Sequence, residues 1–445
     1  MRKLLSVSLV WILMLSMLAA CGSGDQEGTE QPAAKPNGSE ASSESSVSGE
    51  ITVLTNRTDI VDDVFKKQYV PKFNEKYPDV TVNFEALSDY EGQVKMRLNT
   101  EDYGDVLLIP NDIIPSDLPQ FFEPLGTIEE LSGKYMYPQE KSHEGTSYGI
   151  PMIVNAQGIV YNRAVFEQAG ISELPKSTDE FMAAMRQIKE KTDAIPYYTN
   201  YAAGWTLNQW ENNRLSIAGD PEFTNIQLPN SQDPFAPGKP HHTLYKLMYD
   251  LAKEGLIEED PTTTDWESSK AMMGRGEIGA MVLGSWAITQ MQGAAENPDD
   301  IAYMPFPSQA NGKMYSASGG DYKLAISKHS KNKEAAKAWF YWFLEESGFS
   351  EQQGAISPIK GQPMPETLSA FDELGVELIA EVPAKEGQEG WLDQIDQKAE
   401  IGFWQPNFKQ RIIEAALDLR DESFEDIIAD LNSKWNEAQK QVTGQ

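Results

Sequence analysis

The chain has 445 residues, of which 40% are hydrophobic, and its 68 acidic residues outnumber 37 Lys and Arg residues to give a formal net charge of −31. This acidity argues against nucleic acid as a partner, because phosphate binding needs clustered Lys and Arg, and we interpret it as solvation at a cell surface. The length is enough for two domains or lobes with a large core. The single cysteine has no second cysteine in the chain with which to form a disulfide.

The first 20 residues have the pattern of a secretory signal peptide. Arg2 and Lys3 form a basic head, residues 4–20 are apolar apart from serines, and two alanines precede Cys21. A basic head, an apolar middle and small residues at the end are typical of such a segment. The apolar run also reaches the lower length limit of a membrane-spanning helix, roughly 17 residues, so the choice between the two depends on the cysteine.

The residues around Cys21 resemble a bacterial lipobox. "LAAC", residues 18–21, matches this signal, in which the cysteine sulfur receives a diacylglyceryl group and cleavage makes the cysteine the new N-terminus. Residues 21–49 are then a lipidated cysteine and a tether, rich in Ser, Gly, Glu and Pro, that cannot bury enough apolar surface to fold. We expect a lipid anchor on the extracellular face of a bacterial, Gram-positive cell membrane, with about 0.8 kcal/mol from each buried CH₂ group.

Strand and helix patterns alternate after residue 50. Strands are predicted over 51–55, 80–87 and 105–110, and Pro71 either breaks the helix between the first two strands or begins a second helix. This alternation is typical of an α/β fold with a mostly parallel sheet, in which ligands bind beyond the carboxyl ends of the strands. That edge would hold Asn56, Arg57 and Asp112.

A further strand is predicted over 278–283, and Gly284, Ser285 and Trp286 follow it directly. The glycine permits a tight turn, and the serine can cap the next helix. Trp286 then either faces the crevice or packs between the end of the strand and the helix, and this local pattern leaves both possibilities open.

Three longer segments resemble the maltose-binding-like family, the lipid-anchored extracellular solute-binding proteins of carbohydrate ABC transporters. They are "YGIPMIVNAQGIVYNRAVFEQAGISELPKSTDEFMAAMRQIK", "GAMVLGSWA" and "SGGDYKLAISKHSKNKEAAKAWFYWFL". The resemblance implies an α/β, two-lobed fold of the type II periplasmic-binding-protein kind, in which the chain crosses between lobes near 153–158, 315–321 and 355–361. We therefore expect lobe 1 to hold 50–154 and 320–357, and lobe 2 to hold 157–316 and 361–443.

The same resemblance implies a sugar ligand between the lobes, with aromatic rings against its C–H faces and polar side chains against its hydroxyls. Trp286 and Trp404 match stacking positions of the family, whereas Trp339, Trp342 and Trp435 lie on apolar helix patterns and are expected in the core. The candidate ligand-binding residues are Asn56, Arg57, Asp112, Asn155, Trp205, Trp210, Asp265, Trp266, Trp286, Gly320, Asp321 and Trp404. Caps, turns and surface ion pairs are the alternative roles of the polar members.

The resemblance thus predicts a monomeric binding protein that closes on a sugar and delivers it to the permease subunits of an ABC transporter. Asn155 stands where maltose-type members carry an acid, so the sequence indicates a carbohydrate without specifying which one. We expect no catalytic residue, no cofactor and no metal ion. Two alternatives stay open: a glycoside hydrolase, which needs two carboxylates roughly 5 to 10 Å apart, and a surface protein that binds a peptide or another polymer.

Overall fold

The structure is a computed structural model that describes residues 47–88, 90–111 and 113–444. The expected signal peptide, Cys21, most of the tether and the candidate Asp112 lie outside these ranges. All described residues belong to one compact unit. Within them, no helix combines the length and the apolar character needed to cross a bilayer.

The first sheet has the strand order β2-β1-β3-β13-β7. Its strands are β1 (Gly49–Thr55), β2 (Val80–Ala86), β3 (Val106–Leu108), β7 (Ile150–Pro151) and β13 (Lys323–Ile326). β1 pairs in parallel with β2 and β3, and β13 pairs antiparallel with β3 and β7. The three strands predicted in this part of the sequence are confirmed, because their short apolar and β-branched runs are bounded by polar turn residues.

Helices beside the first sheet complete one hydrophobic core. They are η1 (Val61–Tyr69), α1 (Val70–Lys76), α2 (Tyr90–Leu98), α3 (Leu118–Phe121), α4 (Ile128–Ser132), α12 (Lys333–Glu345) and α13 (Phe349–Gln352). α1 continues η1 directly, and Pro71 lies in its first turn, as one of the two expected alternatives had it. Trp339 and Trp342 are buried in this core, as predicted, with the ring of Phe73 5.1 Å from that of Trp339. A small sheet, β4 (Gly126–Thr127), β6 (Thr146–Ser147) and β5 (Ser142–His143), lies in the same half of the chain.

The second sheet has the order β14-β12-β8-β10-β9, with β11 also paired to β8. Its strands are β8 (Val154–Asn162), β9 (Ile195–Tyr197), β10 (Ile278–Gly284), β11 (Ile301–Pro305), β12 (Tyr315–Gly320) and β14 (Glu377–Ile379). Its helices are α5 (Arg163–Ala169), α6 (Thr178–Lys191), α7 (Trp205–Asn208), α8 (Arg214–Ala218), α9 (Pro240–Lys253), α10 (Trp266–Gly274), α11 (Ala287–Ala294), α14 (Ser369–Leu374), α15 (Trp391–Ala399), α16 (Asn407–Ala416) and α17 (Phe424–Thr443).

Successive residues of the second sheet's strands enter two different cores. Ile159 and Val282 belong to the core that also holds the fully buried Trp435 of α17, which confirms the prediction for that tryptophan. Val160 and Leu283 belong to the core beneath α10, α11 and α14. Because side chains alternate across a strand, both faces of this part of the sheet are covered, and β10 and β11 accordingly carry no charged or amide side chain.

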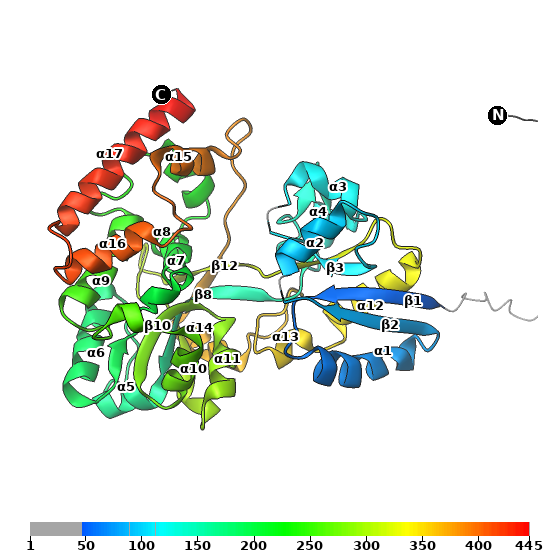
Figure 1. The fold of residues 1–445 in the computed structure, drawn as a ribbon, viewed down its shortest axis with the longest axis horizontal. Helices are drawn as coiled ribbons and strands as arrows, with labels where there is room; N and C mark the ends of the chain where they lie inside the picture. Colours follow the sequence, from blue (N-terminus) through cyan, green and yellow to red (C-terminus); the bar gives the residue numbers. More distant parts are fainter. Residues whose placement is uncertain (1–46, 89, 112, 445) are drawn as a thin grey trace, which may run out of the picture. The chain divides into compact units, whose positions relative to one another are not determined.

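The strand directions differ from the mostly parallel sheets that we expected, since both sheets are mixed. β8 runs antiparallel to β10, β11 and β12, and only β9 and β14 join the second sheet by parallel pairing. The chain enters the second sheet along β8 and leaves it along β12, so these two neighbours must run in opposite directions. Figure 1 shows β8 (teal) linking the blue elements of the first sheet to the green elements of the second.

The chain passes between the sheets at three places. β7 ends at Pro151 and β8 begins at Val154, while β12 ends at Gly320 and β13 begins at Lys323. The third passage lies beside the start of β8, where Ile356 forms an isolated β-bridge with Val154. The division of the other residues between two lobes stays a prediction.

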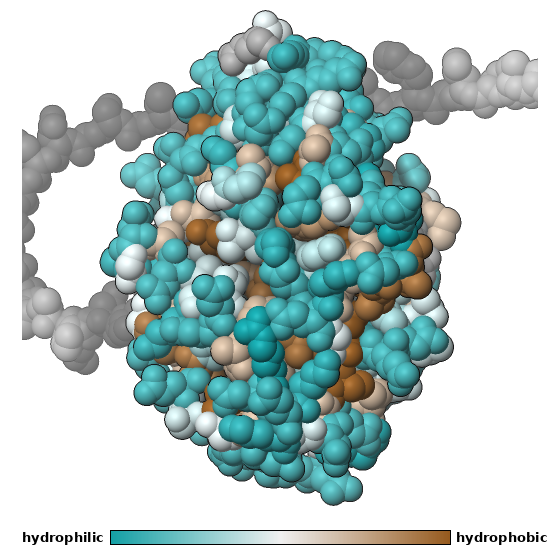
Figure 2. Space-filling view, turned by 90° about the vertical axis from the view of Figure 1, so that its left-hand side faces the viewer, coloured by the Kyte–Doolittle hydropathy of each residue, from teal (hydrophilic) through white to brown (hydrophobic). Residues whose placement is uncertain are grey.

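Hydrophilic residues cover most of the face shown in Figure 2, and apolar residues lie between them in small groups. This face is the left-hand side of Figure 1, where α17 lies. A surface of this kind agrees with our interpretation of the high net charge as a means of solvation.

Candidate functional site

Two amide side chains project from the same face of β8 near the passage between the sheets. Asn155 and Gln157 are two residues apart, which places them on one side of the strand. Their neighbours across the sheet are Gly319 and Gly284, which have no side chains to cover them. The Oε1 atom of Gln157 is buried without a hydrogen-bond partner, so the strand presents an unused acceptor there.

Three tryptophans cluster at the carboxyl end of β10. The ring centroids of Trp205 and Trp266 are 5.0 Å apart, and each lies 5.9 Å from the ring centroid of Trp286. Gly284 permits this arrangement, because a Cβ atom there would lie 2.6 Å from the Trp286 ring. Trp205 is 38% exposed, which leaves part of the cluster open to a ligand.

Ser285 does not cap the helix that follows β10. Its hydroxyl accepts a hydrogen bond from the backbone N–H of Ala156 at 3.0 Å and lies 3.5 Å from Oδ1 of Asn155. No side chain caps α11. The serine instead ties the end of β10 to β8, because its hydroxyl is buried beside that strand.

Asn56 and Arg57 follow β1 of the first sheet, and Asp321 lies in the passage between β12 and β13. The guanidinium of Arg57 donates to Asp59 at 2.9 and 2.7 Å and to Gln353 at 2.7 Å. Oδ1 of Asn56 is a second buried acceptor without a partner. Burial raises the pKa of Asp321, while the neighbouring Lys323 and Arg57 and a hydrogen bond from Asn155 act in the opposite direction.

Two other candidates have structural roles in this structure. The carboxylate of Asp265 accepts a hydrogen bond from the backbone N–H of Ser268 at 2.8 Å and so caps the N-terminus of α10. Gly320 donates its N–H to Glu140 at 3.0 Å, and a Cβ atom at this glycine would lie 2.3 Å from the ring of Pro151. Gly320 therefore permits the close approach of β12 and β7.

Trp210 lies apart from the other candidate tryptophans. Its ring is 1% exposed within the core of the second sheet, and its Nε1 donates to the hydroxyl of Tyr197 at 2.9 Å. The residues on either side of it in the sequence, "LNQWENN", are mostly polar. The chain nevertheless turns after α7 and directs the ring inward, where the tyrosine satisfies its N–H group.

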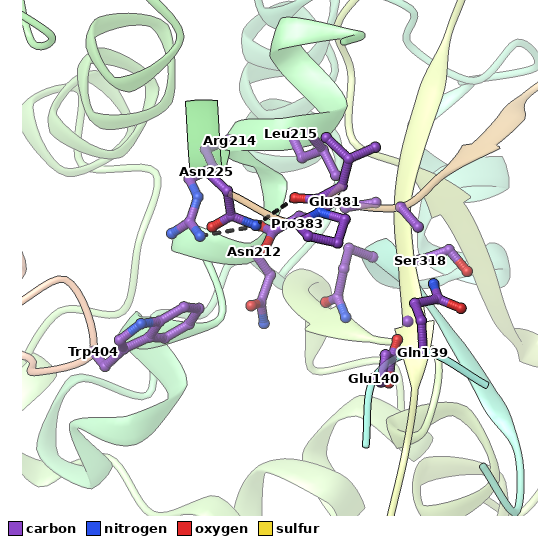
Figure 3. A pocket seen from close by; sticks show the side chains of 15 residues that line it. Gln139, Glu140, Asn212, Arg214, Leu215, Asn225, Ser318, Glu381, Pro383 and Trp404 are labelled. Atoms are coloured by element: carbon purple, nitrogen blue, oxygen red, sulfur yellow. Dashed lines mark hydrogen bonds and ion pairs between the residues drawn. The ribbon is translucent and has the colours of Figure 1, made fainter. Parts of the chain in front are cut away.

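Trp404 borders a cavity of about 410 Å³ that is lined by β8 and β12 of the second sheet, by α8 and its neighbouring loops, and by Gln139 and Glu140. Figure 3 shows Trp404 on one side of this cavity, Gln139 and Glu140 on the other, and Arg214, Leu215, Glu381 and Pro383 along its upper wall. The complete lining consists of Gln139, Glu140, Gln157, Asn212, Arg214, Leu215, Asn225, Ala317, Ser318, Gly319, Ala380, Glu381, Val382, Pro383 and Trp404.

The charged groups of this cavity have partners of opposite charge. Arg214, which is buried, bonds to Glu211 at 2.9 Å and to Glu381 at 3.1 Å, and its guanidinium lies 5.4 Å from the ring centroid of Trp404. Burial raises the pKa of Glu211, but His241 and Arg214 lower it more strongly, to about 2. Its carboxylate also accepts from His241 and from the hydroxyl of Tyr245.

Glu140 forms the corresponding pair near the first sheet. Its carboxylate bonds to Lys323 at 2.6 Å and accepts the N–H of Gly320. Tyr137, three residues earlier, donates its hydroxyl to Ser318 of β12 at 3.0 Å. Tyr137 and Glu140 therefore contact β12 near the passage between the sheets, and Gln139 and Glu140 line the cavity.

Of the ligand-binding residues predicted from the sequence, only Trp404 lines this cavity. Gln157 could have been found, since it follows Asn155 by two residues in the expected crossover 153–158, and two such residues face the same side of an extended strand. Arg214 and Glu381 gave no such signal, because they are 167 residues apart and meet only in the folded chain.

The family model of the bacterial extracellular solute-binding proteins matches residues 57–348 of the chain. The chain belongs to this family. Its fold is accordingly the two-lobed, type II fold of periplasmic binding proteins, as the resemblance implied. Among the described residues, no group of three His, Cys, Asp or Glu side chains could hold a metal ion.

Solved structures and sequence relatives agree with this assignment. The chain is 38% identical to an ABC-transporter binding protein from Bifidobacterium animalis subsp. lactis in complex with mannobiose, with a TM-score of 0.78 over 89% of this chain and 95% of that one. A manno-oligosaccharide-specific solute-binding protein of the same organism, in complex with mannotriose, gives 36% identity and the same TM-score and coverage. The "Multiple sugar-binding protein" of Streptococcus mutans is 25% identical over 62% of this chain and 67% of its own length.

These matches are to binding proteins and not to enzymes. One short stretch, residues 145–149 ("GTSYG"), has the glycine–serine–glycine spacing of a hydrolase nucleophile. Ser147 is fully buried, however, and its hydroxyl donates to the carbonyl of Gly149 at 3.2 Å. A nucleophile must be exposed at a turn between a strand and a helix, so this serine has a structural role.

Proposed function

We propose that this solute-binding protein holds a manno-oligosaccharide of two or three units in the cavity beside Trp404 and Gln157. The observation that supports this proposal is the combination of a half-exposed tryptophan with an unpartnered amide oxygen in one cavity of about 410 Å³. A sugar offers an apolar C–H face for the ring and hydroxyl donors for the amide. Three solved structures that are 36% to 39% identical to this chain are complexes with mannobiose or mannotriose.

The tryptophans near β10 extend this site. Asn208 on α7 donates its side-chain N–H to the backbone carbonyl of Trp404 at 2.8 Å, and Trp205 begins the same short helix. Trp205, Trp266 and Trp286 would then stack on a further sugar unit, while Asn56, Arg57, Asn155 and Asp321 meet its hydroxyl groups.

Delivery to a transporter follows from a ligand that contacts both lobes. Such a ligand binds the closed arrangement better than the open one and shifts the population toward it, by as much as its affinities for the two differ. We propose that the closed monomer then docks on ABC permease subunits encoded by separate chains, with lobes divided near 153–158, 315–321 and 355–361. The ABC-transporter proteins among the solved relatives support this role.

We also propose that Cys21 carries a lipid that anchors the protein on the outer face of the cell membrane. The "LAAC" motif, the apolar run before it and the polar residues after it support this anchor. Cys21→Ala in the full chain should abolish labelling by a radioactive fatty acid and leave the chain either unprocessed or released. If the wild-type chain takes up no fatty acid, the anchor is refuted.

Calorimetry on the purified full chain tests the proposed ligand. Mannobiose and mannotriose should bind without turnover, and at 100 times the Kd either sugar should stabilise the protein by about 2.7 kcal/mol. Raffinose and chito-oligosaccharides serve as comparison ligands of other sugar classes. Binding of one of these in place of the manno-oligosaccharides would overturn the mannose assignment, and failure to bind any of the sugars would overturn the carbohydrate role.

A further inference from the structure

The segment that carries Trp404 needs support from outside itself. Trp404 is 49% exposed and belongs to no hydrophobic cluster among the described residues. The backbone around it is tightly turned, with positive φ angles of 53° at Glu400 and 74° at Gly402. A ring with so few apolar neighbours keeps one orientation only if its backbone is held in place.

Two charged side chains supply that support. Lys409 of α16 is fully buried, and its Nζ donates to the carbonyl of Phe403 at 2.7 Å and to that of Gln405 at 3.0 Å. These are the carbonyls on either side of Trp404 in the sequence. Asp396 of α15 accepts the backbone N–H groups of Gly402 at 2.9 Å and of Phe403 at 3.1 Å. The segment 402–405 is therefore held through both its donors and its acceptors.

Stability alone does not explain these charges. Removing an ammonium or a carboxylate from water costs several kcal/mol, and apolar residues of similar size often give equal or greater stability. Burial lowers the pKa of Lys409 to about 8 and raises the pKa of Asp396. Both shifts disfavour the charged form, as expected when a charged group is removed from water. The hydrogen bonds of the lysine go to the carbonyls beside Trp404, which indicates a role in orienting that segment.

We propose that Lys409 and Asp396 are positioning residues for ligand binding, which act by fixing the backbone of 402–405 so that the Trp404 ring faces the cavity. This inference rests on the proposed function only in taking the ligand to be a sugar. Neither residue lines the cavity. Both therefore act through Trp404, and their contribution to affinity should vanish when the tryptophan is absent.

A double-mutant cycle tests this dependence, because coupled residues give effects on the free energy that do not add. We expect Lys409→Met to weaken mannobiose binding at least fivefold in the wild-type chain and less than twofold in the Trp404→Ala chain. Lys398→Met, at an exposed position on α15, is the matched control and should leave the affinity unchanged. Equal fold-changes in the two backgrounds would overturn the inference. Should Lys409→Met fail to fold, Asp396→Leu takes its place in the cycle, because it removes both oxygens that accept from Gly402 and Phe403; equal fold-changes in the two backgrounds would again overturn the inference.

A measurement without ligand separates this inference from the proposed function. The full chain labelled with 5-fluorotryptophan gives fluorine resonances, and Trp404→Phe identifies the one from Trp404. Lys409→Met should shift or broaden that resonance and leave the resonance of the core residue Trp210 unchanged. An unaltered Trp404 resonance would overturn the positioning role, even if no sugar binds to the wild-type chain. If the resonance changes but no sugar binds, the proposed function fails and the positioning role stands.

Discussion

Replacing Trp404 by alanine should reduce sugar affinity far more than it reduces stability. The ring is 49% exposed, so about half of the 150–250 Å² that a tryptophan can bury, roughly 100 Å², is free to be covered by the ligand. At about 25 cal/mol per Å², the lost coverage amounts to about 2.5 kcal/mol, or roughly 70-fold in Kd. The variant also loses the half of the ring surface that is buried in the protein, together with the contact with Arg214. These two losses set an upper limit of about 3 kcal/mol on the destabilisation of the fold.

Trp210→Ala is the matched control, because its ring is 1% exposed in the core of the second sheet. It should destabilise the protein by about 3 to 5 kcal/mol, as buried tryptophans do, while the folded fraction binds with wild-type affinity. Calorimetric titration and urea unfolding of both variants give the two quantities for each. A Trp404→Ala protein that binds mannobiose as tightly as the wild type would refute the reasoning about the cavity.

Three further substitutions distinguish ligand contacts from structural contacts. Gln157→Leu should weaken sugar binding about tenfold in calorimetry and leave the urea midpoint unchanged or higher, because it removes a buried acceptor without a partner. Asp265→Ala should cost about 1 kcal/mol of stability through the lost cap, and any change in affinity would contradict its assignment as a cap. The pKa of Glu211 is about 2 in the folded chain against 4.5 ordinarily, so its stabilisation is present above pH 4.5 and is lost as the pH falls toward 2. Urea unfolding of Glu211→Gln should show a weaker pH dependence than that of the wild type in that range. An equal pH dependence of the two proteins would contradict the lowered pKa of Glu211.

The strands of the fold could be predicted where the signal is local. β1, β3 and β10 each contain a short apolar run followed by polar or glycine residues, and all three lie where the sequence placed them. The direction of pairing could not be predicted in the same way. β8 and β12 pair Ala156 with Ser318, across more than 150 residues of chain, and no local pattern specifies such a partner.

The tryptophans show why only part of the site could be predicted. Trp205 and Trp210 share one polar stretch, "WTLNQW", yet the first is 38% exposed and the second is in the core. Five residues along a helical path rotate a side chain by roughly 140°, so two rings in one such stretch point to different sides. The local composition does not distinguish the two rings, and it is the tertiary packing around α7 that exposes one and buries the other. Trp286 lies between these extremes, because its ring packs on two other tryptophans and is partly buried.

The charges of the cavity argue for a neutral ligand despite the strong acidity of the chain. Glu140 is paired with Lys323, and Arg214 is paired with both Glu211 and Glu381, so the walls present charges that already have partners. A neutral sugar can bind to the amide groups and the tryptophan without disturbing these pairs. An ionised ligand would have to compete for one member, and a buried charge that loses its partner costs about 3 to 5 kcal/mol. Uncharged oligosaccharides should therefore bind in preference to uronic acids of the same length, because only the latter must break an existing ion pair.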